Sequence, residues 1–502
     1  MSSEKRVLSI DVGTESCKTI LFNAEGGSLA RSYQKYPIVI PESSWAEQNP
    51  LLWWDAVRKG VRDVLRKSQC SAEEIACVSV TGQSPVLVAV DKQGIPLMNA
   101  IIWMDRRAID ETNKIKGVTG LKEDPSMMLP KIMWVKSKRP QVFRSAWKFL
   151  QSADFVGYRL TNRFATDWLT AGTLHFDVKE GKWPCETLES LDIPAEKLPD
   201  VIGPTYVAGI VSKEGSEQTG LSMETPVVLT GIDAYMATVG VNALAPGRIC
   251  EITGSSTCIM VPSGHEIRDP ERRVRCSEFP IVPDLWIVWG IMSSTGAALR
   301  WFRENFSREK DSYPSLDREA AKAPPGSDRL IFLPYMMGER SPIWDTSARG
   351  VFVGFSMNHT RKHFIRAILE GCAFGIRHNL ETIERLGGKV DQIWSCGGAA
   401  NSRIFGQIKA DVIGKSVIIP REIEAPALGA AMLGTVAVKL HKDLKEASRS
   451  MIRAKCKINP RKASHKIYDL QFQMYKDAYL RLKGYFKRYH SSREELGIGD
   501  QA

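Results

Sequence analysis

Two short strand–turn–strand patterns, about 240 residues apart, constrain this chain more than any other feature. The first hairpin spans residues 7–22 and turns at 11–16; the second hairpin spans residues 247–261 and turns at 253–256. Both turns combine Gly with hydroxyl side chains, so several backbone N–H groups can point the same way and form a nest for an anion. Because each hairpin opens a domain-sized segment, we expect a duplicated fold that closes on a phosphate between its lobes. The alternative is two ordinary hairpins, and neither turn carries the Walker A pattern G-x-x-x-x-G-K-[ST].

Length and composition narrow the class of protein. The chain has 502 residues, which is too long for one ordinary domain. Hydrophobic residues make up 43% and charged residues 25%, which excludes a mainly disordered or fibrous protein. No apolar run approaches the roughly 18 residues of a membrane span, and no secretory signal pattern precedes the first strand. The ten cysteines form no C-x-x-C pair, which favours reduced thiols over disulfides or a zinc site. We therefore expect a soluble, cytoplasmic protein.

Patterns in the second half help to define the domains. A long helix is predicted at 360–386, a strand at 392–396 that runs into a glycine pair, and a small-residue helix at 425–435. A strand, a glycine pair and a helix N-terminus make a place where backbone can approach a ligand closely. The predicted domains are an N-terminal domain at 1–242, a C-terminal domain at 243–437 and a basic helical extension at 438–502.

The net charge of +11 is concentrated near the C-terminus. Between Lys439 and Arg488 there are 15 Lys and Arg residues against 4 Asp and Glu, an excess equal to the net charge of the whole chain. Such a segment can bind nucleic acid or a membrane surface. The favoured interpretation is a solvated face of a docked helix, because apolar residues recur at helical spacing on it: Tyr468, Phe472, Tyr475, Tyr479 and Leu482.

Several motifs, in order along nearly the whole chain, resemble those of the FGGY carbohydrate kinase family, in its xylulokinase-like branch. The matching segments are Ser9–Thr14, Ala46–Pro50 with Trp53-Trp54, Trp103–Arg107, Pro130–Trp134, Gly338–Asp345 and Gly350–Gly371. The resemblance implies an α/β fold of the actin-like type, shared with hexokinase and heat-shock chaperones, with two lobes and with ATP and a sugar in the interdomain cleft.

The resemblance also assigns the phosphate-binding residues. Asp11 is expected to anchor Mg²⁺ through water, because Mg²⁺ keeps much of its hydration shell. Gly13, Thr14 and Lys18 would face the γ-phosphate. From the other lobe, the β- and γ-phosphates would be held by Thr253, Gly254 and Ser255, with Ser256 completing the turn.

The most valuable assignment is the general base. Residues 228–234 read as a strand, a glycine turn and then Asp233 at the start of a small-residue helix. The segment resembles the family's G-x-x-D element, whose Asp takes the proton from the sugar hydroxyl, a role suited to a carboxylate. The alternative for Asp233 is a helix N-cap.

The remaining site residues concern adenosine and the sugar. The family's adenosine loop is resembled by four residues: Gly397, Gly398, Ala399 and Asn401. Gly296 resembles a second glycine on the nucleotide side; the alternative role for Gly296 is to allow close packing at a helix N-terminus. Sugar contacts are expected from Gln83, Ser84, Trp103, Asp105 and Asp233. This chain has Ser84-Pro85 where xylulokinases have Met-His, and it lacks the Arg-Glu pair of glycerol kinases.

The function expected from the resemblance is ATP-dependent phosphorylation of a pentulose, with Mg²⁺. Alternatives are a kinase for glycerol or another polyol, an actin-like filament or chaperone ATPase, and a catalytically silent sugar-sensing protein with a basic tail. A filament protein does not need Asp233, and a silent protein would be expected to lose Asp11 or Asp233. The expected partners are a small sugar or polyol and a second copy of the chain, with no membrane and no nucleic acid.

Overall fold

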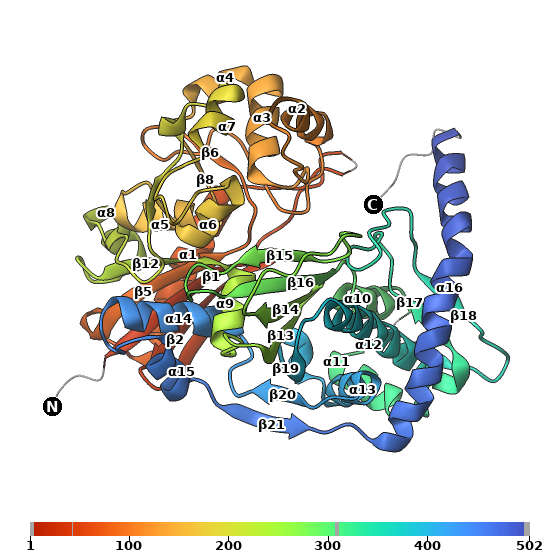
Figure 1. Ribbon diagram of the computed structural model, residues 1–502. Helices are drawn as coiled ribbons and strands as arrows, with labels where there is room; N and C mark the ends of the chain where they lie inside the picture. Colours follow the sequence, from red (N-terminus) through yellow and green to blue (C-terminus); the bar gives the residue numbers. More distant parts are fainter. Residues whose placement is uncertain (1–4, 43, 307–310, 496–502) are drawn as a thin grey trace. The chain divides into compact units, whose positions relative to one another are not determined.

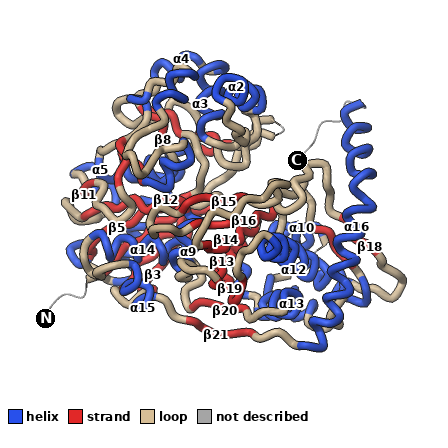
Figure 2. The backbone as a smooth tube through the Cα atoms, viewed as in Figure 1, coloured by secondary structure: helices blue, strands red, loops and turns tan. Residues whose placement is uncertain are grey.

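The computed structural model describes residues 5–42, 44–306 and 311–495 (Figure 1). The chain forms two compact units. Unit 1 contains residues 5–240 and 425–452, and unit 2 contains residues 241–424 and 453–495. Figure 2 draws the strands in red; most strands of each unit belong to one large sheet, and the others form two-stranded pairs.

Unit 1 is built on a six-stranded mixed sheet with the order β11-β12-β5-β1-β2-β3. Strand β2 is antiparallel to both of its neighbours, β1 and β3, whereas β1, β5 and β12 are parallel. The central strand β1 is apolar or small at nearly every position and is buried from Val7 to Val12, as expected for a strand covered on both faces. The strands are β1 (Arg6–Val12), β2 (Ser16–Asn23), β3 (Ser28–Lys35), β5 (Ile75–Gly82), β11 (Gly209–Ile210) and β12 (Pro226–Ile232).

Helices pack on this sheet for reasons that are local in sequence. Helix α1 (Pro50–Ser68) contacts β2 and β3; its first position is Pro50, and Asn49 caps it by accepting the Leu51 N–H. Helix α14 (Ala425–Ala437) packs on β1 and β5 and crosses α9 (Asp233–Gly240). The crossing brings backbones into contact, because a Cβ on Gly240 or on Gly429 would lie 2.0 Å from a backbone carbonyl oxygen.

Unit 1 also carries a helical layer beyond its sheet, with its own apolar cluster around Leu129, Ile132 and Phe149. The other elements of unit 1 are β4 (Glu47–Gln48), β6 (Val88–Val90), β7 (Ala100–Ile101), α2 (Ile109–Thr119), α3 (Met128–Lys138), α4 (Pro140–Ser145), β8 (Lys148–Leu150), α5 (Ser152–Thr161), β9 (Ala165–Asp167), α6 (Trp168–Ala171), α7 (Cys185–Ser190), β10 (Asp200–Ile202), α8 (Lys213–Thr219) and α15 (Leu444–Met451).

Unit 2 repeats the topology of unit 1. Its seven-stranded sheet has the order β15-β16-β14-β13-β19-β20-β21. Within it, β16-β14-β13-β19-β20 shows the same succession of two antiparallel and two parallel pairings as β3-β2-β1-β5-β12. The duplication predicted from the two hairpins is therefore confirmed. The strands are β13 (Gly247–Thr253), β14 (Thr257–Ser263), β15 (Arg275–Glu278), β16 (Trp286–Met292), β19 (Val390–Cys396), β20 (Val417–Pro420) and β21 (Ala454–Ile458).

The core of unit 2 lies between its sheet and the long helix α12 (Arg361–Arg385), which also contacts α13 and β17. The predicted helix at 360–386 and strand at 392–396 are thus confirmed as α12 and β19. The other elements of unit 2 are α10 (Gly296–Asn305), α11 (Tyr313–Ala320), β17 (Ile331–Leu333), β18 (Val351–Val353), α13 (Arg403–Ile413) and α16 (Lys462–Glu495).

The basic segment ends in α16, which docks on unit 2 through one apolar face. Tyr468, Phe472, Tyr475 and Tyr479 are at most 5% exposed, and Leu482 packs against the same core. The helical docking predicted from their spacing is therefore confirmed. Within the described residues, no helix, α16 included, has a stretch long and apolar enough to cross a membrane.

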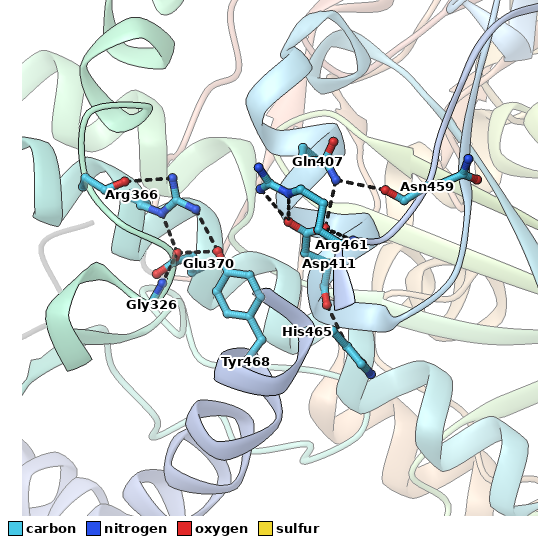
Figure 3. A network of polar contacts seen from close by, with 10 residues as sticks. Gly326, Arg366, Glu370, Gln407, Asp411, Asn459, Arg461, His465 and Tyr468 are labelled. Carbon is cyan, nitrogen blue, oxygen red and sulfur yellow. Dashed lines mark hydrogen bonds and ion pairs between the residues drawn. The ribbon is translucent and has the colours of Figure 1, made fainter. Parts of the chain in front are cut away.

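Polar contacts fix α16 and the residues before it (Figure 3). The Tyr468 hydroxyl donates to Glu370 (2.7 Å), and Arg366 donates to the same carboxylate oxygen (2.7 Å). Arg461 reaches Asp411 on α13 at 2.6 Å. These contacts join the start of α16 and the residue before it to α12 and α13.

The units divide the chain differently from the predicted boundaries. The sequence assigns residues 425–437 to the second domain, yet α14 packs on α9, β1 and β5 and belongs to unit 1. The predicted extension at 438–502 is also divided, because α15 contacts α14 whereas β21 and α16 belong to unit 2. The reason is the glycine-mediated contact of α14 with α9, which joins segments far apart in sequence.

Candidate functional site

The first hairpin carries a charged pair beside its turn. Asp11 lies near the end of β1, directly across from Lys18 on β2, and the Lys18 Nζ is 3.4 Å from the Asp11 carboxylate. The Asp11 side chain is 3% exposed and the Lys18 side chain 26%, so the ammonium is the more accessible group. The Gly13 N–H donates to the Ser16 carbonyl (3.1 Å), and the Tyr36 hydroxyl donates to the Gly13 carbonyl (2.5 Å). The predicted residues Asp11, Gly13 and Lys18 therefore lie together.

Asp233 is positioned by a bulged strand end. Strand β12 shifts register against β5 between Leu229 and Gly231, and Gly231 has a φ of +95°, which favours glycine. A side chain at Gly231 would also meet the Asp167 carboxylate at 2.8 Å. Helix α9 begins at Asp233, whose Oδ1 accepts the Ala234 N–H (2.7 Å). This bond comes from the next residue, whereas an N-cap side chain accepts an N–H two or three residues further on, so the structure shows no N-cap hydrogen bond for Asp233.

The electrostatics of this corner suit a proton acceptor. The Asp233 side chain is only partly exposed and densely surrounded by protein atoms, and this burial, followed by the Asp11 carboxylate, raises the pKa of Asp233 to about 7. Lys18 acts in the opposite direction. A carboxyl with a pKa near the working pH can both take up and release a proton.

A chain of side chains links the first hairpin to the predicted sugar contacts. The Trp103 indole donates to the Thr14 hydroxyl (2.9 Å), so the two predicted residues touch. Gln48 donates to the Thr14 carbonyl (2.7 Å) and accepts from the Gln83 amide (2.7 Å). Gln83 is 2% exposed, and its Oε1 has no hydrogen-bond partner among the described residues. Gln83 therefore offers a fixed, buried acceptor next to the turn.

Ser84 and Asp105 are committed to protein contacts. The Ser84 hydroxyl donates to Gln151 (2.6 Å). Asp105 is fully buried; its carboxylate accepts from the Arg107 guanidinium (3.0, 2.9 and 2.7 Å), from the Arg107 backbone N–H (2.9 Å) and from the Ala46 N–H (2.6 Å). This environment does not match the predicted role of Asp105 as an acceptor for a sugar hydroxyl. Its observed role is to hold the loop that carries Trp103.

In unit 2, three predicted nucleotide loops converge. A Cβ on Gly296 would lie 2.1 Å from the Gly254 carbonyl oxygen, and one on Gly397 would lie 2.7 Å from the Thr253 carbonyl oxygen. The N–H groups of Thr295 and Ala297 both donate to the Ser255 carbonyl (3.0 Å each). The second hairpin, the start of α10 and the loop after β19 are thus in backbone contact, which only glycine allows at these positions.

The loop after β19 forms a short 3₁₀ turn over Gly398–Asn401, ahead of α13. The Asn401 amide donates to the Gly398 carbonyl (3.3 Å), and Asn401 is exposed. Ala399 packs partly against the core. Gly397 adopts a φ of +79°, so this glycine is required for the shape of the loop, whereas a Cβ on Gly398 would meet nothing within 4 Å.

The sequence analysis missed two residues that organise unit 1. Gln48 connects Thr14 to Gln83 from within the Ala46–Pro50 segment, and its position inside a recognised motif is the signal that could have indicated a role. Arg107 neutralises Asp105 and stacks on the Trp45 ring, with its guanidinium carbon 3.7 Å from the ring centroid. Nothing in a single sequence indicates that Arg107 turns back onto Asp105.

The metal-binding capacity of the site is limited to few carboxylates. Among the described residues, no cluster of three or more His, Cys, Asp or Glu side chains is arranged to hold a metal ion. Mg²⁺ often binds through one or two carboxylates, water and substrate phosphates. The carboxylate oxygens of Asp11, which lies near Asp233, are ligands of the kind that Mg²⁺ prefers, so Asp11 fits that mode of binding.

Comparison with known proteins gives consistent matches along the chain. Residues 6–240 match the N-terminal domain, and residues 251–438 the C-terminal domain, of the FGGY family of carbohydrate kinases. Xylulose kinase from Bacillus subtilis (strain 168) is 30% identical over 489 residues, covering 95% of this chain and 97% of the relative. Gluconokinase from the same organism is 30% identical over 455 residues, covering 86% and 87%.

The structure of gluconate kinase from Lactobacillus acidophilus is 27% identical and superposes with a TM-score of 0.85, covering 97% of this chain and 99% of that one. The duplicated sheets described above agree with this likeness. The resemblance drawn from the motifs is confirmed: the chain belongs to the FGGY family of carbohydrate kinases and is a sugar kinase with the actin-like fold.

Proposed function

We propose that this sugar kinase transfers the γ-phosphate of ATP to a hydroxyl of a pentulose, with Asp233 as the general base. The observation that carries the proposal is the grouping of Asp233, Asp11 and Lys18 in unit 1. One carboxylate of raised pKa, one buried carboxylate and one accessible ammonium are the groups that a phosphoryl transfer to an alcohol needs. The expected cytoplasmic location and homodimer stay predictions.

The proposed chemistry assigns one task to each group. The Asp233 carboxylate accepts the hydroxyl proton while the substrate oxygen bonds to the γ-phosphorus and the bond to the β-phosphate oxygen of ATP breaks, which releases ADP. The Lys18 ammonium offsets the negative charge on the transferring group. Asp11 would hold Mg²⁺, which when bound neutralises phosphate charge.

The nucleotide assignments follow from the two hairpins. In unit 1, Gly13 and Thr14 supply the turn beside Lys18. In unit 2, Thr253, Gly254 and Ser255 supply the turn of the second hairpin, Gly296 and Gly397 let the neighbouring loops approach it closely, and a Cβ on Gly398 would meet nothing within 4 Å. Ala399 and Asn401 complete the adenosine side of the proposal.

The substrate class rests on Gln83 and Trp103. The unpaired Gln83 Oε1 can accept a sugar hydroxyl, and Trp103 supplies an apolar ring on the same network. A polyhydroxylated, open-chain acceptor fits such a set. The relatives named xylulose kinase and gluconokinase are both 30% identical to this chain, so similarity does not choose between their acceptors.

The decisive test of the base is Asp233→Asn. Asn cannot take up the hydroxyl proton, and the loss of a general base costs about 10²–10⁴-fold in turnover. Asn keeps an acceptor for the Ala234 N–H, so ADP affinity should be unchanged and thermal stability should not fall. Turnover is measured by coupled ADP release, and ADP affinity by calorimetry.

The matched control is Asp443→Asn. Asp443 caps α15 by accepting the Glu446 N–H (2.8 Å), and it has no part in the proposed site. Its variant should keep wild-type turnover. If Asp233→Asn also keeps turnover within a few-fold of wild type, Asp233 is not the base.

The substrate is tested by an acceptor screen over ketopentoses, gluconate, glycerol and erythritol. Because Ser84-Pro85 replaces Met-His, we expect another ketose or polyol to exceed D-xylulose in kcat/KM. A clear preference for D-xylulose over every other acceptor would show that this replacement does not set specificity. Phosphorylation of none of them by a folded, ADP-binding protein would contradict the proposed acceptor class.

A further inference from the structure

A continuous chain of buried polar side chains runs through unit 2 next to the proposed nucleotide loops. It begins at Lys409 on α13, whose Nζ lies 2.6 Å from Oε2 of Glu251 on β13. Lys409 also donates to the Ser395 hydroxyl on β19. These three residues are at most 1% exposed, so the ion pair joins β13, β19 and α13 in the protein interior.

From Glu251 the chain continues through three threonine hydroxyls. Thr253 donates to the second Glu251 oxygen, and its Oγ1 lies 2.7 Å from the Thr257 Oγ1. The Thr257 Oγ1 lies 2.8 Å from the Thr295 Oγ1. All three threonines are at most 2% exposed. A carboxylate only accepts hydrogen bonds, and each hydroxyl has one proton to donate. The direction in which one hydroxyl donates therefore fixes the direction of the next.

Each of the three nucleotide loops has a member of this chain within two residues of its glycine. Thr253 precedes Gly254 in the second hairpin, Thr295 precedes Gly296 at the start of α10, and Ser395 is two residues before Gly397. Backbone contact between the loops is close enough that small shifts matter, as the 2.1 Å approach of a Gly296 Cβ to the Gly254 carbonyl shows. The polar chain therefore fixes the spacing of the groups that would face the phosphates.

The polar composition of this row of buried side chains indicates that it positions the elements it joins and does not only stabilise the fold. Apolar side chains of similar volume often stabilise a core as well as a buried ion pair does. A fully paired polar network instead selects one arrangement of the elements that it joins. Here the elements that carry the nucleotide loops are β13, β19 and the start of α10, and the polar network reaches each of them.

We propose that Glu251, Lys409, Thr257 and Thr295 are positioning residues that hold the three loops of unit 2 in the arrangement that binds the nucleotide. This inference rests on the proposed function, because it takes these loops as the nucleotide site. It predicts that a break in the middle of the chain lowers nucleotide affinity without affecting the acceptor sugar.

The test is made at Thr257, the middle hydroxyl, which touches no loop glycine. Thr257→Val keeps the side-chain shape and removes the hydroxyl; Thr257→Ser keeps the hydroxyl and removes a methyl group. An unpaired partner in a buried network weakens the arrangement, so we expect about a tenfold rise in the ADP dissociation constant and in the KM for ATP for Thr257→Val. The KM for the acceptor should stay within twofold, and Thr257→Ser should restore most of the nucleotide affinity.

The matched control is Thr382→Val on α12. Thr382 is a buried threonine of the same unit whose hydroxyl bonds only within its helix, to the His378 carbonyl (2.8 Å). It should keep wild-type affinity for ADP. If Thr257→Val does not fold, the same Val and Ser pair is made at Thr295, the end of the chain.

The outcomes separate the inference from the function on which it rests. A folded wild type that neither binds ADP nor phosphorylates any acceptor overturns both. Wild-type ADP binding that is unchanged in Thr257→Val overturns the positioning role alone. Equal losses in Thr257→Val and Thr257→Ser also overturn it, because retaining the hydroxyl would then give no advantage over removing it.

Discussion

The two hairpins occupy equivalent places in the two sheets, yet their chemistry differs. In the first hairpin, the second residue pair from the turn is Asp11 and Lys18; in the second hairpin the corresponding pair is Ile252 and Cys258. In both, the leading strand is flanked by an antiparallel and a parallel neighbour. The duplicated backbone is thus conserved between the units while the charges are present beside only one of the turns.

The second unit has its charge farther from the turn and neutralises it. Glu251 is one residue further back along β13, fully buried and paired with Lys409. Between this pair and the loops lie only hydroxyls. Unit 1 instead has two neighbouring carboxylates and one ammonium, and burial together with Asp11 raises the pKa of Asp233. In the proposed function, proton transfer and charge compensation therefore belong to unit 1 and neutral hydrogen bonding to unit 2.

The largest effect is expected from Lys18→Met in the first hairpin. It removes the cation beside Asp11, which together with the Ala234 N–H lowers the pKa of Asp233, so kcat/KM should fall by about 10²–10³-fold. The equivalent position in the second hairpin supplies the control, because Cys258→Ser changes a residue with no proposed role in charge compensation. Steady-state kinetics at saturating acceptor measure both. Equal effects of the two changes would contradict the assignment of charge compensation to the first hairpin.

A smaller difference is expected between Thr14→Val and Ser255→Val. Each removes one hydroxyl from a phosphate turn and should weaken nucleotide binding by about tenfold. Thr14 also accepts the Trp103 indole, so its loss should raise the KM for the acceptor as well, whereas Ser255→Val should raise only the KM for ATP. Wild-type kinetics in both variants would refute the proposal that both turns contribute to nucleotide binding.

Local patterns predicted much of the fold and part of the site. Both hairpins, α12, β19 and the docking of α16 follow from periodicity, glycine turns and β-rich runs, which act over a few residues. The place of α14 did not follow, because its contact with α9 depends on Gly240 and Gly429, far apart in the chain. The Glu251–Lys409 pair spans 158 residues, and a lysine on a predicted helix gives no signal of a buried partner. The sequence predicted Asp105 as a sugar contact, because it cannot show that the Arg107 side chain folds back and binds the Asp105 carboxylate.

The smallest effect that we expect is on the pH dependence of stability, and it concerns buried carboxylates that do or do not pair with a cation. Unlike Glu251, Asp154 in unit 1 is buried near a second carboxylate, Asp167, and burial followed by Asp167 raises the pKa of Asp154 to about 7. In the unfolded chain this pKa is near 3.9. Between these two values the folded state therefore binds more protons than the unfolded state. Stability from this group is fully present below about pH 4 and is lost as the pH rises through 7, by up to about 1.4 kcal/mol per pH unit.

Asp154→Asn should remove this dependence while its side-chain oxygen still accepts the Gln151 N–H, which now lies 2.8 Å from Oδ2. Urea unfolding of wild type and variant at pH 5 and pH 7.5 measures the effect. Relative to wild type, the variant should gain stability at the higher pH, because Asn stays neutral where Asp must ionise in a buried place. Parallel stability curves for the two proteins would show that Asp154 ionises in the folded state as readily as in water. The proposed contrast between Glu251, which is paired with the buried Lys409, and Asp154, which is buried near another carboxylate, would then not hold.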